Sequence, residues 1–278
     1  MTSDLTARAA YAVAKARHRR RVGRTRSSAA PVVVFSMAKT GSSAVVAGLR
    51  SAGIDDVHHV HDLDPTFLVE EERDYRWSGR PWRNWEAQAL CRRLPTPSSP
   101  WRVVTIVRDP IAQSVSAFFQ PGALRGYVHP GATVDELLER FADRLERMPM
   151  RWFEAHVVPA FGLDVYDHPF DHAAGHQRIT TPTVDLLVLR CEGLLTTGPA
   201  PLAALVGADR PIEVPEVNRA AEKDHAELYR AFVAALRPSD EVLERTYSSR
   251  YDQHFYTEPE IEGFRRRWAS DHGERAPR

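Results

Sequence analysis

Cysteine is scarce in this chain of 278 residues: Cys91 and Cys191 are the only two, and they stand far apart. Two isolated cysteines form neither a disulfide framework nor a thiolate metal site, so we expect a reducing, cytoplasmic setting. No stretch approaches the roughly 20 apolar residues that span a bilayer, so we expect no integral membrane segment. Net charge is also absent, since 37 Lys and Arg residues balance 37 Asp and Glu residues.

The balanced charge is unevenly distributed. Residues 1–30 contain eight Lys or Arg residues and one acidic residue, a net charge of +7, so the remainder carries −7. This start lacks the apolar core of a secretion signal and predicts a basic tail, helical or disordered, before one domain at 31–278. Peripheral contact of the tail with an anionic membrane surface stays open. The acidic remainder argues against nucleic acid as a partner, and the oligomeric state stays unknown.

Short, β-branched apolar runs alternate with helical periodicity along most of the chain. Runs that are apolar on both faces are typical of central strands in a parallel sheet. Strands are predicted at residues 31–35, 57–61, 101–107 and 185–190, and C-terminal helices at 220–236, 239–247 and 258–269. The alternation predicts an α/β fold, a P-loop-like three-layer sandwich with a central parallel sheet flanked by helices and a helical C-terminal region.

The first candidate site is the loop between the strand at 31–35 and a helix predicted from Ala44 to Ser51. A loop with glycine and serine before a helix N-terminus forms an anion cradle, because its amides point inward and the helix adds partial positive charge. Lys39 supplies a full charge. The other predicted ligand-binding residues here are Thr40, Gly41, Ser42 and Ser43. An ordinary strand-to-helix turn with a surface lysine is the alternative.

The second candidate site follows the strand at 101–107. Asp109 is a predicted helix N-cap and Pro110 the first helical residue. Ser116 lies eight positions after Arg108, and because helical side chains lean towards the N-terminus, both can approach one ligand. The guanidinium fork of Arg108 suits a phosphate monoester. The alternative is a surface pair of Arg108 with Asp109 and a serine packed on the sheet.

Both motifs stand at the carboxyl ends of predicted parallel strands, where α/β sheets bind ligands near a topological switch point. Together they resemble the sulfotransferase superfamily that uses 3′-phosphoadenosine 5′-phosphosulfate (PAPS). In that family the loop reads Pro-Lys-Ser/Thr-Gly-Thr/Ser-Thr/Ser, and here Ala38 replaces the proline. The second motif reads Arg, Asn or Asp, Pro, with a serine eight residues after the arginine. The resemblance implies PAPS as co-substrate, the first loop on the 5′-phosphosulfate, Arg108 and Ser116 on the 3′-phosphate, and no metal.

The remainder resembles a bacterial branch named for capsular polysaccharide synthesis. The matching stretches are residues 152–153, 161–166, 218–229 and 251–268. In relatives a basic C-terminal segment closes over the nucleotide, which implies that role for Arg219, together with Asn218 and Lys223. A solvated helix is the alternative for this segment.

Transfer to a hydroxyl needs a general base with a pKa near neutrality, and histidine is the usual choice. His58, His59 and His61 belong to the predicted second strand. In cytosolic sulfotransferases the catalytic histidine ends the equivalent strand, which implies His61 as the base. His59 is the second candidate because residues two apart share one strand face, whereas His58 points the other way. A histidine that only caps the strand end is the alternative.

The predicted protein is an enzyme, a PAPS-dependent sulfotransferase that moves a sulfuryl group to a hydroxyl of a small molecule or saccharide and releases 3′,5′-adenosine bisphosphate. Lys39 would neutralise charge on the leaving oxygen. One alternative is a P-loop-like kinase or nucleotide hydrolase, with Asp109 as the metal ligand. It is disfavoured because a Walker A glycine directly precedes its lysine, whereas here Lys39 precedes Gly41. Another is a non-enzymatic polyanion- or membrane-binding adaptor that acts through the basic tail.

The acceptor is not evident from the sequence. Polar and aromatic residues between 65 and 90 and between 120 and 130 could line its pocket or belong to the core. Three further histidines, His168, His172 and His176, are assigned to a polar surface loop, and no metal site is predicted.

Overall fold

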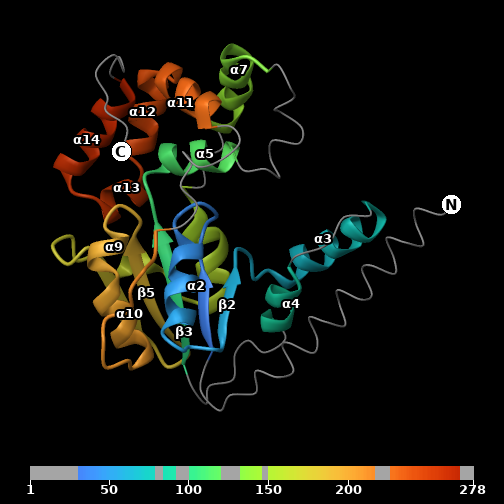
Figure 1. Ribbon diagram of the computed structural model, residues 1–278, viewed down its shortest axis with the longest axis vertical. Coiled ribbons are helices and arrows are strands. Elements are labelled where there is room, and N and C mark those ends of the chain that lie inside the picture. The colour runs from blue at the N-terminus through green and yellow to red at the C-terminus, as the bar shows by residue number, and fades with distance from the viewer. Residues whose placement is uncertain are drawn as a thin grey trace.

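A five-stranded mixed sheet forms the centre of the protein (Figure 1). The computed structural model describes residues 31–78, 84–91, 100–119, 132–145, 150–216 and 226–269, the side chains of 73–78 excepted. The predicted tail at 1–30 lies outside them. The strand order is β2–β1–β3–β5–β4, and helices flank the sheet. The protein therefore has the predicted α/β architecture.

Four strands run parallel: β1 (Val32–Phe35), β2 (Val57–Val60), β3 (Trp101–Val107) and β5 (Val184–Arg190). Every residue of β1 is buried, as are nearly all residues of β3 and β5. Burial on both faces explains the uninterrupted apolar runs in the sequence and confirms these four strands.

The sheet departs from the prediction at one edge, where it is antiparallel. β4 (His176–Thr180) pairs antiparallel with β5, Gln177 opposite Val188, although the sequence assigned this segment to a polar loop. Its side chains alternate in burial, with Gln177 and Ile179 inside, so β4 has no apolar run. The overlooked signal is the short turn around Pro182, which joins the two strands as a hairpin.

Helices cover both faces of the sheet and gather beyond its carboxyl ends. The elements up to β5 are α2 (Ser42–Ser51), α3 (Pro65–Ser78), α4 (Trp85–Cys91), α5 (Pro110–Phe118), α7 (Val134–Leu145), the π-turn η1 (Phe153–Val157), α8 (Val158–Phe161) and the 3₁₀ turn η2 (Val165–Asp167). Those after β5 are α9 (Leu194–Thr197), α10 (Pro199–Val206), α11 (Ala226–Ala235), α12 (Asp240–Tyr247), α13 (Arg250–Phe255) and α14 (Glu258–Ala269). The helices predicted at 239–247 and 258–269 are confirmed as α12 and α14. α11 lies within the helix predicted at 220–236, and α13 was not predicted.

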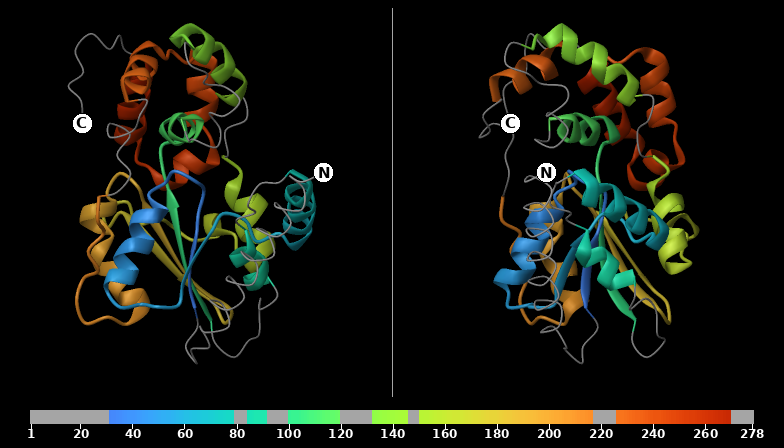
Figure 2. Two further views of the ribbon diagram at one scale, coloured as in Figure 1. Left: turned by 45° about the vertical axis from the view of Figure 1, so that its right-hand side comes forward. Right: turned by 90° about the vertical axis from the view of Figure 1, so that its right-hand side faces the viewer.

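Alternate residues of β1 belong to two separate cores. Val32 and Val34 pack with α2 and α10 on one face of the sheet. Val33 and Phe35 pack on the other face, where the Phe35 and Trp152 rings lie 5.0 Å apart. Figure 2 shows helices on both sides of the sheet. The period-two alternation of a strand therefore produces the three layers.

A helical group covers the carboxyl ends of the strands. α5, α7, α11, α12 and α14 lie together there, beyond the loops that leave β1 and β3 (Figure 1). None of the helices in the described ranges is both long enough and apolar enough to span a bilayer.

Gly48 and Gly263 provide a matched test of the packing of α2. A Cβ on Gly48 would lie 2.4 Å from the Glu213 carbonyl oxygen, whereas a Cβ on Gly263 would meet nothing within 4 Å. We expect Gly263→Ala to stabilise α14 by about 0.5–1 kcal/mol, the usual helix gain over glycine. Gly48→Ala should instead destabilise the protein by about 1–3 kcal/mol, because the backbone must shift. Chemical denaturation measures both, and equal stabilisation by the two substitutions would contradict this packing.

Candidate anion-binding site

The two predicted motifs meet at the topological switch point of the sheet. β1 has β2 on one side and β3 on the other, so the strand order reverses between β1 and β3. The loop after β1 contains Lys39, and the turn after β3 contains Arg108. In open α/β sheets this position, outside the carboxyl ends of the strands, is where ligands bind.

Two buried hydroxyl groups hold the loop after β1 in place through hydrogen bonds. The Ser36 hydroxyl lies 2.6 Å from that of Thr40 and 3.1 Å from the Ile106 carbonyl oxygen on β3. The Thr40 hydroxyl donates to the Met37 carbonyl at 2.9 Å, and both side chains are fully buried. The Thr40 hydroxyl therefore holds the loop from inside and is not available to a ligand, unlike the role predicted for this side chain.

The same loop contains backbone N–H groups that lead into the N-terminus of α2. The N–H groups of Gly41, Ser42 and Ser43 have no acceptor among the described residues, whereas the Thr40 N–H closes the turn at 38–39 towards the Met37 carbonyl. The Gly41 carbonyl accepts from Ala44 at 2.9 Å and so begins α2. Unpaired amides at a helix N-terminus attract anions, because the helix dipole adds to their partial charges. The geometry of this loop is compatible with the predicted anion cradle, whose binding of an anion stays a prediction.

Two residues of the cradle have left-handed backbone. Gly41 has φ +93°, and a Cβ there would lie 2.7 Å from the Leu194 side chain, so the position requires glycine. Lys39 has φ +69° and is the only non-glycine residue with positive φ in the described part of the chain. Left-handed backbone costs an L-residue about 1–2 kcal/mol. Such strain persists where the surroundings impose it, often at functional sites.

The β3–α5 segment imposes this conformation. The Arg108 guanidinium Nη1 donates to the Lys39 carbonyl at 2.7 Å. The Gln113 side-chain amide donates to the Ala38 carbonyl at 2.7 Å. The two predicted motifs are therefore in direct contact, and Gln113 is a residue that the sequence did not single out.

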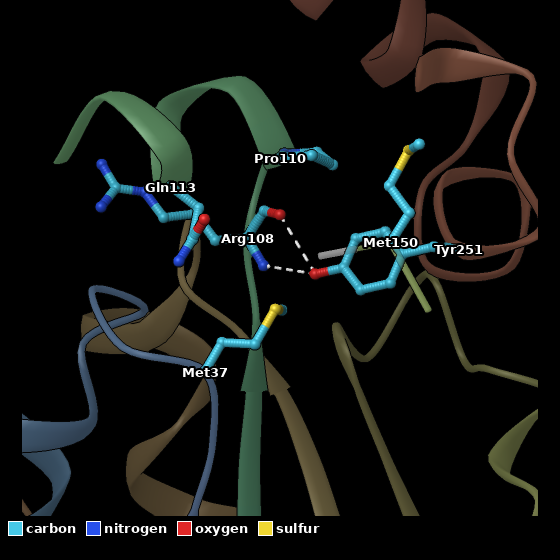
Figure 3. A pocket seen from close by; sticks show the side chains of 6 residues that line it. All are labelled: Met37, Arg108, Pro110, Gln113, Met150 and Tyr251. Carbon is cyan, nitrogen blue, oxygen red and sulfur yellow. Dashed lines mark hydrogen bonds between the residues drawn. The ribbon is translucent and has the colours of Figure 1, made fainter. Parts of the chain in front are cut away.

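Arg108 is itself held from the C-terminal helices. The Tyr251 hydroxyl accepts from the Arg108 N–H at 2.9 Å and donates to its carbonyl at 3.1 Å (Figure 3). Burial raises the pKa of Tyr251 well above its usual range, so its hydroxyl stays protonated. Beside these groups lies a cavity of about 10 Å³, room for about one water. Its lining residues are Met37, Arg108, Pro110, Gln113, Met150 and Tyr251.

Asp109 is the predicted N-cap of α5, with Pro110 next to it. Its Oδ1 accepts from the Ile111 N–H at 3.0 Å and from the Tyr247 hydroxyl at 2.9 Å. Its Oδ2 accepts from the Trp268 indole at 2.9 Å, and the residue is 1% exposed. Both oxygens are thus occupied by protein donors, which disfavours Asp109 as a metal ligand.

Two predicted phosphate contacts have less support in the structure. Ser116 is half-buried on α5, and its hydroxyl has no hydrogen-bond partner in the part of the chain that the structure describes. Among the described residues no contact joins Ser116 to Arg108, so their shared ligand stays a prediction. Arg219, with Asn218 and Lys223, lies outside the described residues.

The candidate bases occupy the same edge of the cradle. His61 Nδ1 lies 2.6 Å from the Ser36 carbonyl oxygen. Because a carbonyl only accepts, Nδ1 carries a proton, and Nε2 is the ring nitrogen that points away from this bond. His61 is exposed, directly after β2. The site therefore presents one histidine with an available basic nitrogen.

His59 shares the face of His61, as predicted, but is more enclosed. Its Nε2 lies 2.9 Å from the Ser42 hydroxyl, and its ring lies 4.8 Å from that of His61. Burial, reinforced by His61, lowers the pKa of His59 to about 4. His58 points to the other side, between Asp56 and Glu86, each at 2.9 Å.

Two further described histidines bond backbone carbonyls. His172 Nε2 lies 3.1 Å from the His254 carbonyl, and His176 Nδ1 lies 3.1 Å from the Ala174 carbonyl. Across the described residues, no three His, Cys, Asp or Glu side chains gather as metal ligands would.

The structure defines an α/β protein with a candidate anion-binding loop at the switch point of its sheet. Residues 128–257 match the model of a family described as "putative capsular polysaccharide synthesis protein". This stretch contains Tyr247 and Tyr251 but neither the loop after β1 nor Arg108. The match gives no support for the PAPS-dependent superfamily. Searches of curated proteins and of solved structures find no match.

The low pKa of His59 predicts acid sensitivity. Between about pH 6.5 and about pH 4 the unfolded chain binds a proton at this residue while the folded chain does not, so stability falls as pH decreases. We expect a loss of about 2–3 kcal/mol over that window from this residue. The His59→Gln variant should lose less stability than wild type over the same pH range. Chemical denaturation at each pH measures the free energy of unfolding, and His168→Gln is the control variant. Equal losses in wild type and His59→Gln would contradict the assignment.

Proposed function

We propose that this protein is a PAPS-dependent sulfotransferase. The observation that carries the proposal is the contact of Arg108 with the Lys39 carbonyl at the switch point of the sheet. It joins a loop of open amides, a lysine and an arginine in one site. PAPS carries two separate anionic groups, the 5′-phosphosulfate and the 3′-phosphate, and such a site can bind both.

Each cationic group has a distinct role in this proposal. Lys39 and the amides of 41–43 bind the phosphosulfate, and Thr40 holds the loop. One Nη1–H bond of Arg108 goes to the Lys39 carbonyl, and the guanidinium has five N–H donors in all, so others remain for the 3′-phosphate. Ser116 and Arg219 stay additional proposed contacts.

The proposed reaction is a single in-line transfer. The Nε2 of His61 takes the proton of the acceptor hydroxyl as that oxygen forms a bond to sulfur. The bond between sulfur and the bridging phosphate oxygen breaks, and its electron pair leaves with 3′,5′-adenosine bisphosphate. Lys39 and the loop amides stabilise the charge on that oxygen, so catalysis is mainly positioning and electrostatics. His59, hydrogen-bonded to Ser42 and with its pKa lowered to about 4, is the weaker base.

We further propose a saccharide as the acceptor. The family match over residues 128–257 is named for capsular polysaccharide synthesis, and sugars carry many hydroxyl groups. A small non-sugar alcohol remains the other acceptor class.

Calorimetric titration with 3′,5′-adenosine bisphosphate tests the proposal. We expect a Kd of about 1 µM, with AMP about 10- to 100-fold weaker because the charged 3′-phosphate contacts are lost. Lys39→Ala and Arg108→Ala should each weaken binding by about ten-fold or more. Deletion of residues 1–28 should leave the affinity unchanged. Preference for ATP with Mg²⁺, or loss of binding only in the deletion variant, would overturn the proposal.

Substitution of His61 separates binding from chemistry. We expect His61→Gln to lower kcat by about 100-fold or more, because general base catalysis contributes at least that much, with bisphosphate affinity unchanged. The assay is bisphosphate release from PAPS with a panel of saccharide acceptors. His59→Gln is the matched variant and should keep more of the rate. If His59→Gln loses the rate and His61→Gln keeps it, the base is His59.

A further inference from the structure

Gln113 is a buried polar residue outside both motifs. It lies on α5, is 4% exposed, and its side chain is 2.7 Å from the Ala38 carbonyl oxygen. Because a carbonyl only accepts, the amide nitrogen of Gln113 must be the atom that faces Ala38. The side chain extends from α5 on the same side as that of Arg108 (Figure 3). Gln113 and Arg108 thus hold the carbonyls of two consecutive residues, Ala38 and Lys39.

Holding two successive carbonyls fixes the two amides that follow them. In an extended chain successive carbonyls point to opposite sides. Here the left-handed φ of Lys39 lets both carbonyls face the segment 108–113. In a planar trans peptide the N–H points away from the C=O. The N–H groups of Lys39 and Thr40 are therefore both directed away from that segment, that of Thr40 towards the Met37 carbonyl, and amides that face one side form an anion-binding concavity.

We propose that Gln113 is a positioning residue of the anion cradle: it fixes the Ala38–Lys39 peptide so that the Lys39 amide joins those of 41–43 around one phosphate or sulfuryl group. This inference rests on the proposed function, since the cradle is the proposed phosphosulfate site. Gln113 acts through the loop and does not itself touch the ligand.

Gln177 is a matched control for the burial and bonding of Gln113. It is 6% exposed, and its side-chain amide donates to the carbonyls of His168 at 2.6 Å and Pro169 at 3.0 Å. These contacts lie at β4, the opposite edge of the sheet from β2. Replacement of either glutamine by methionine removes a buried donor and keeps the side-chain length. Both variants should lose stability, and only one should lose ligand affinity.

The experiment compares full-length wild type, Gln113→Met and Gln177→Met. Calorimetry measures the affinity for 3′,5′-adenosine bisphosphate and for inorganic pyrophosphate, and NMR follows the amide signals of Lys39 and Thr40 during each titration. We expect Gln113→Met to weaken the binding of both ligands about ten-fold and to reduce the ligand-induced change in the chemical shift of the Lys39 amide. Gln177→Met should bind like wild type. Equal binding by the two variants, or a Lys39 amide that never responds in wild type, overturns the proposal.

Gln113→Glu tests the same bond should Gln113→Met fail to fold. A protonated carboxyl can donate to the Ala38 carbonyl, whereas a carboxylate repels it. The affinity of this variant relative to wild type should therefore fall between about pH 4 and about pH 7, where glutamate ionises. A pH-independent ratio contradicts the proposal.

The two ligands separate this inference from the proposed function. If wild type binds pyrophosphate but not the bisphosphate, and Gln113→Met weakens the binding of pyrophosphate, the positioning role stands and the sulfotransferase proposal fails. If wild type and Gln113→Met bind the bisphosphate equally, the sulfotransferase proposal stands and the positioning role fails.

Discussion

The candidate site depends on how two peptide carbonyls are held. Lys39 adopts a left-handed conformation that costs an L-residue about 1–2 kcal/mol. The hydrogen bonds from Arg108 and Gln113 to the carbonyls of Lys39 and Ala38 contribute about 1 kcal/mol each, a comparable amount. The amide row of the cradle therefore exists because α5 and its preceding turn hold the loop, and the loop sequence alone does not impose it.

The segment that holds the loop is in turn held by the last third of the chain. Tyr251 bonds both backbone groups of Arg108, and Tyr247 and Trp268 bond the carboxylate of Asp109. Hydrogen bonds thus connect α12, α13 and α14 to a loop that begins at residue 36. The family match reaches Tyr247 and Tyr251 but not Arg108, so it includes residues that support the site and omits the cradle itself.

The sequence predicts those features whose cause is local. The apolar runs of β1 and β3 and the Asp109-Pro110 helix start are such features, and the structure contains all three. β4 escaped prediction because an edge strand with one buried face has no apolar run. Gln113 escaped because its contact lies 75 positions away in sequence, and nothing in the local pattern distinguishes it from a surface residue. The left-handed Lys39 likewise follows from that tertiary contact.

The hydrogen bonds to the Asp109 carboxylate decide whether this residue could bind a metal ion. A P-loop nucleotide hydrolase binds Mg²⁺ through a carboxylate at a strand end. To offer Asp109 to a metal, the protein would have to break bonds to the Tyr247 hydroxyl and the Trp268 indole, both in the buried core. Each buried donor left unpaired costs about 1–3 kcal/mol. The nearby Glu192 is also engaged, since its oxygens accept from the Asp109 N–H and the Tyr256 hydroxyl. Both carboxylates beside the switch point are therefore engaged by protein donors, which disfavours phosphoryl chemistry that needs a metal held at this strand end.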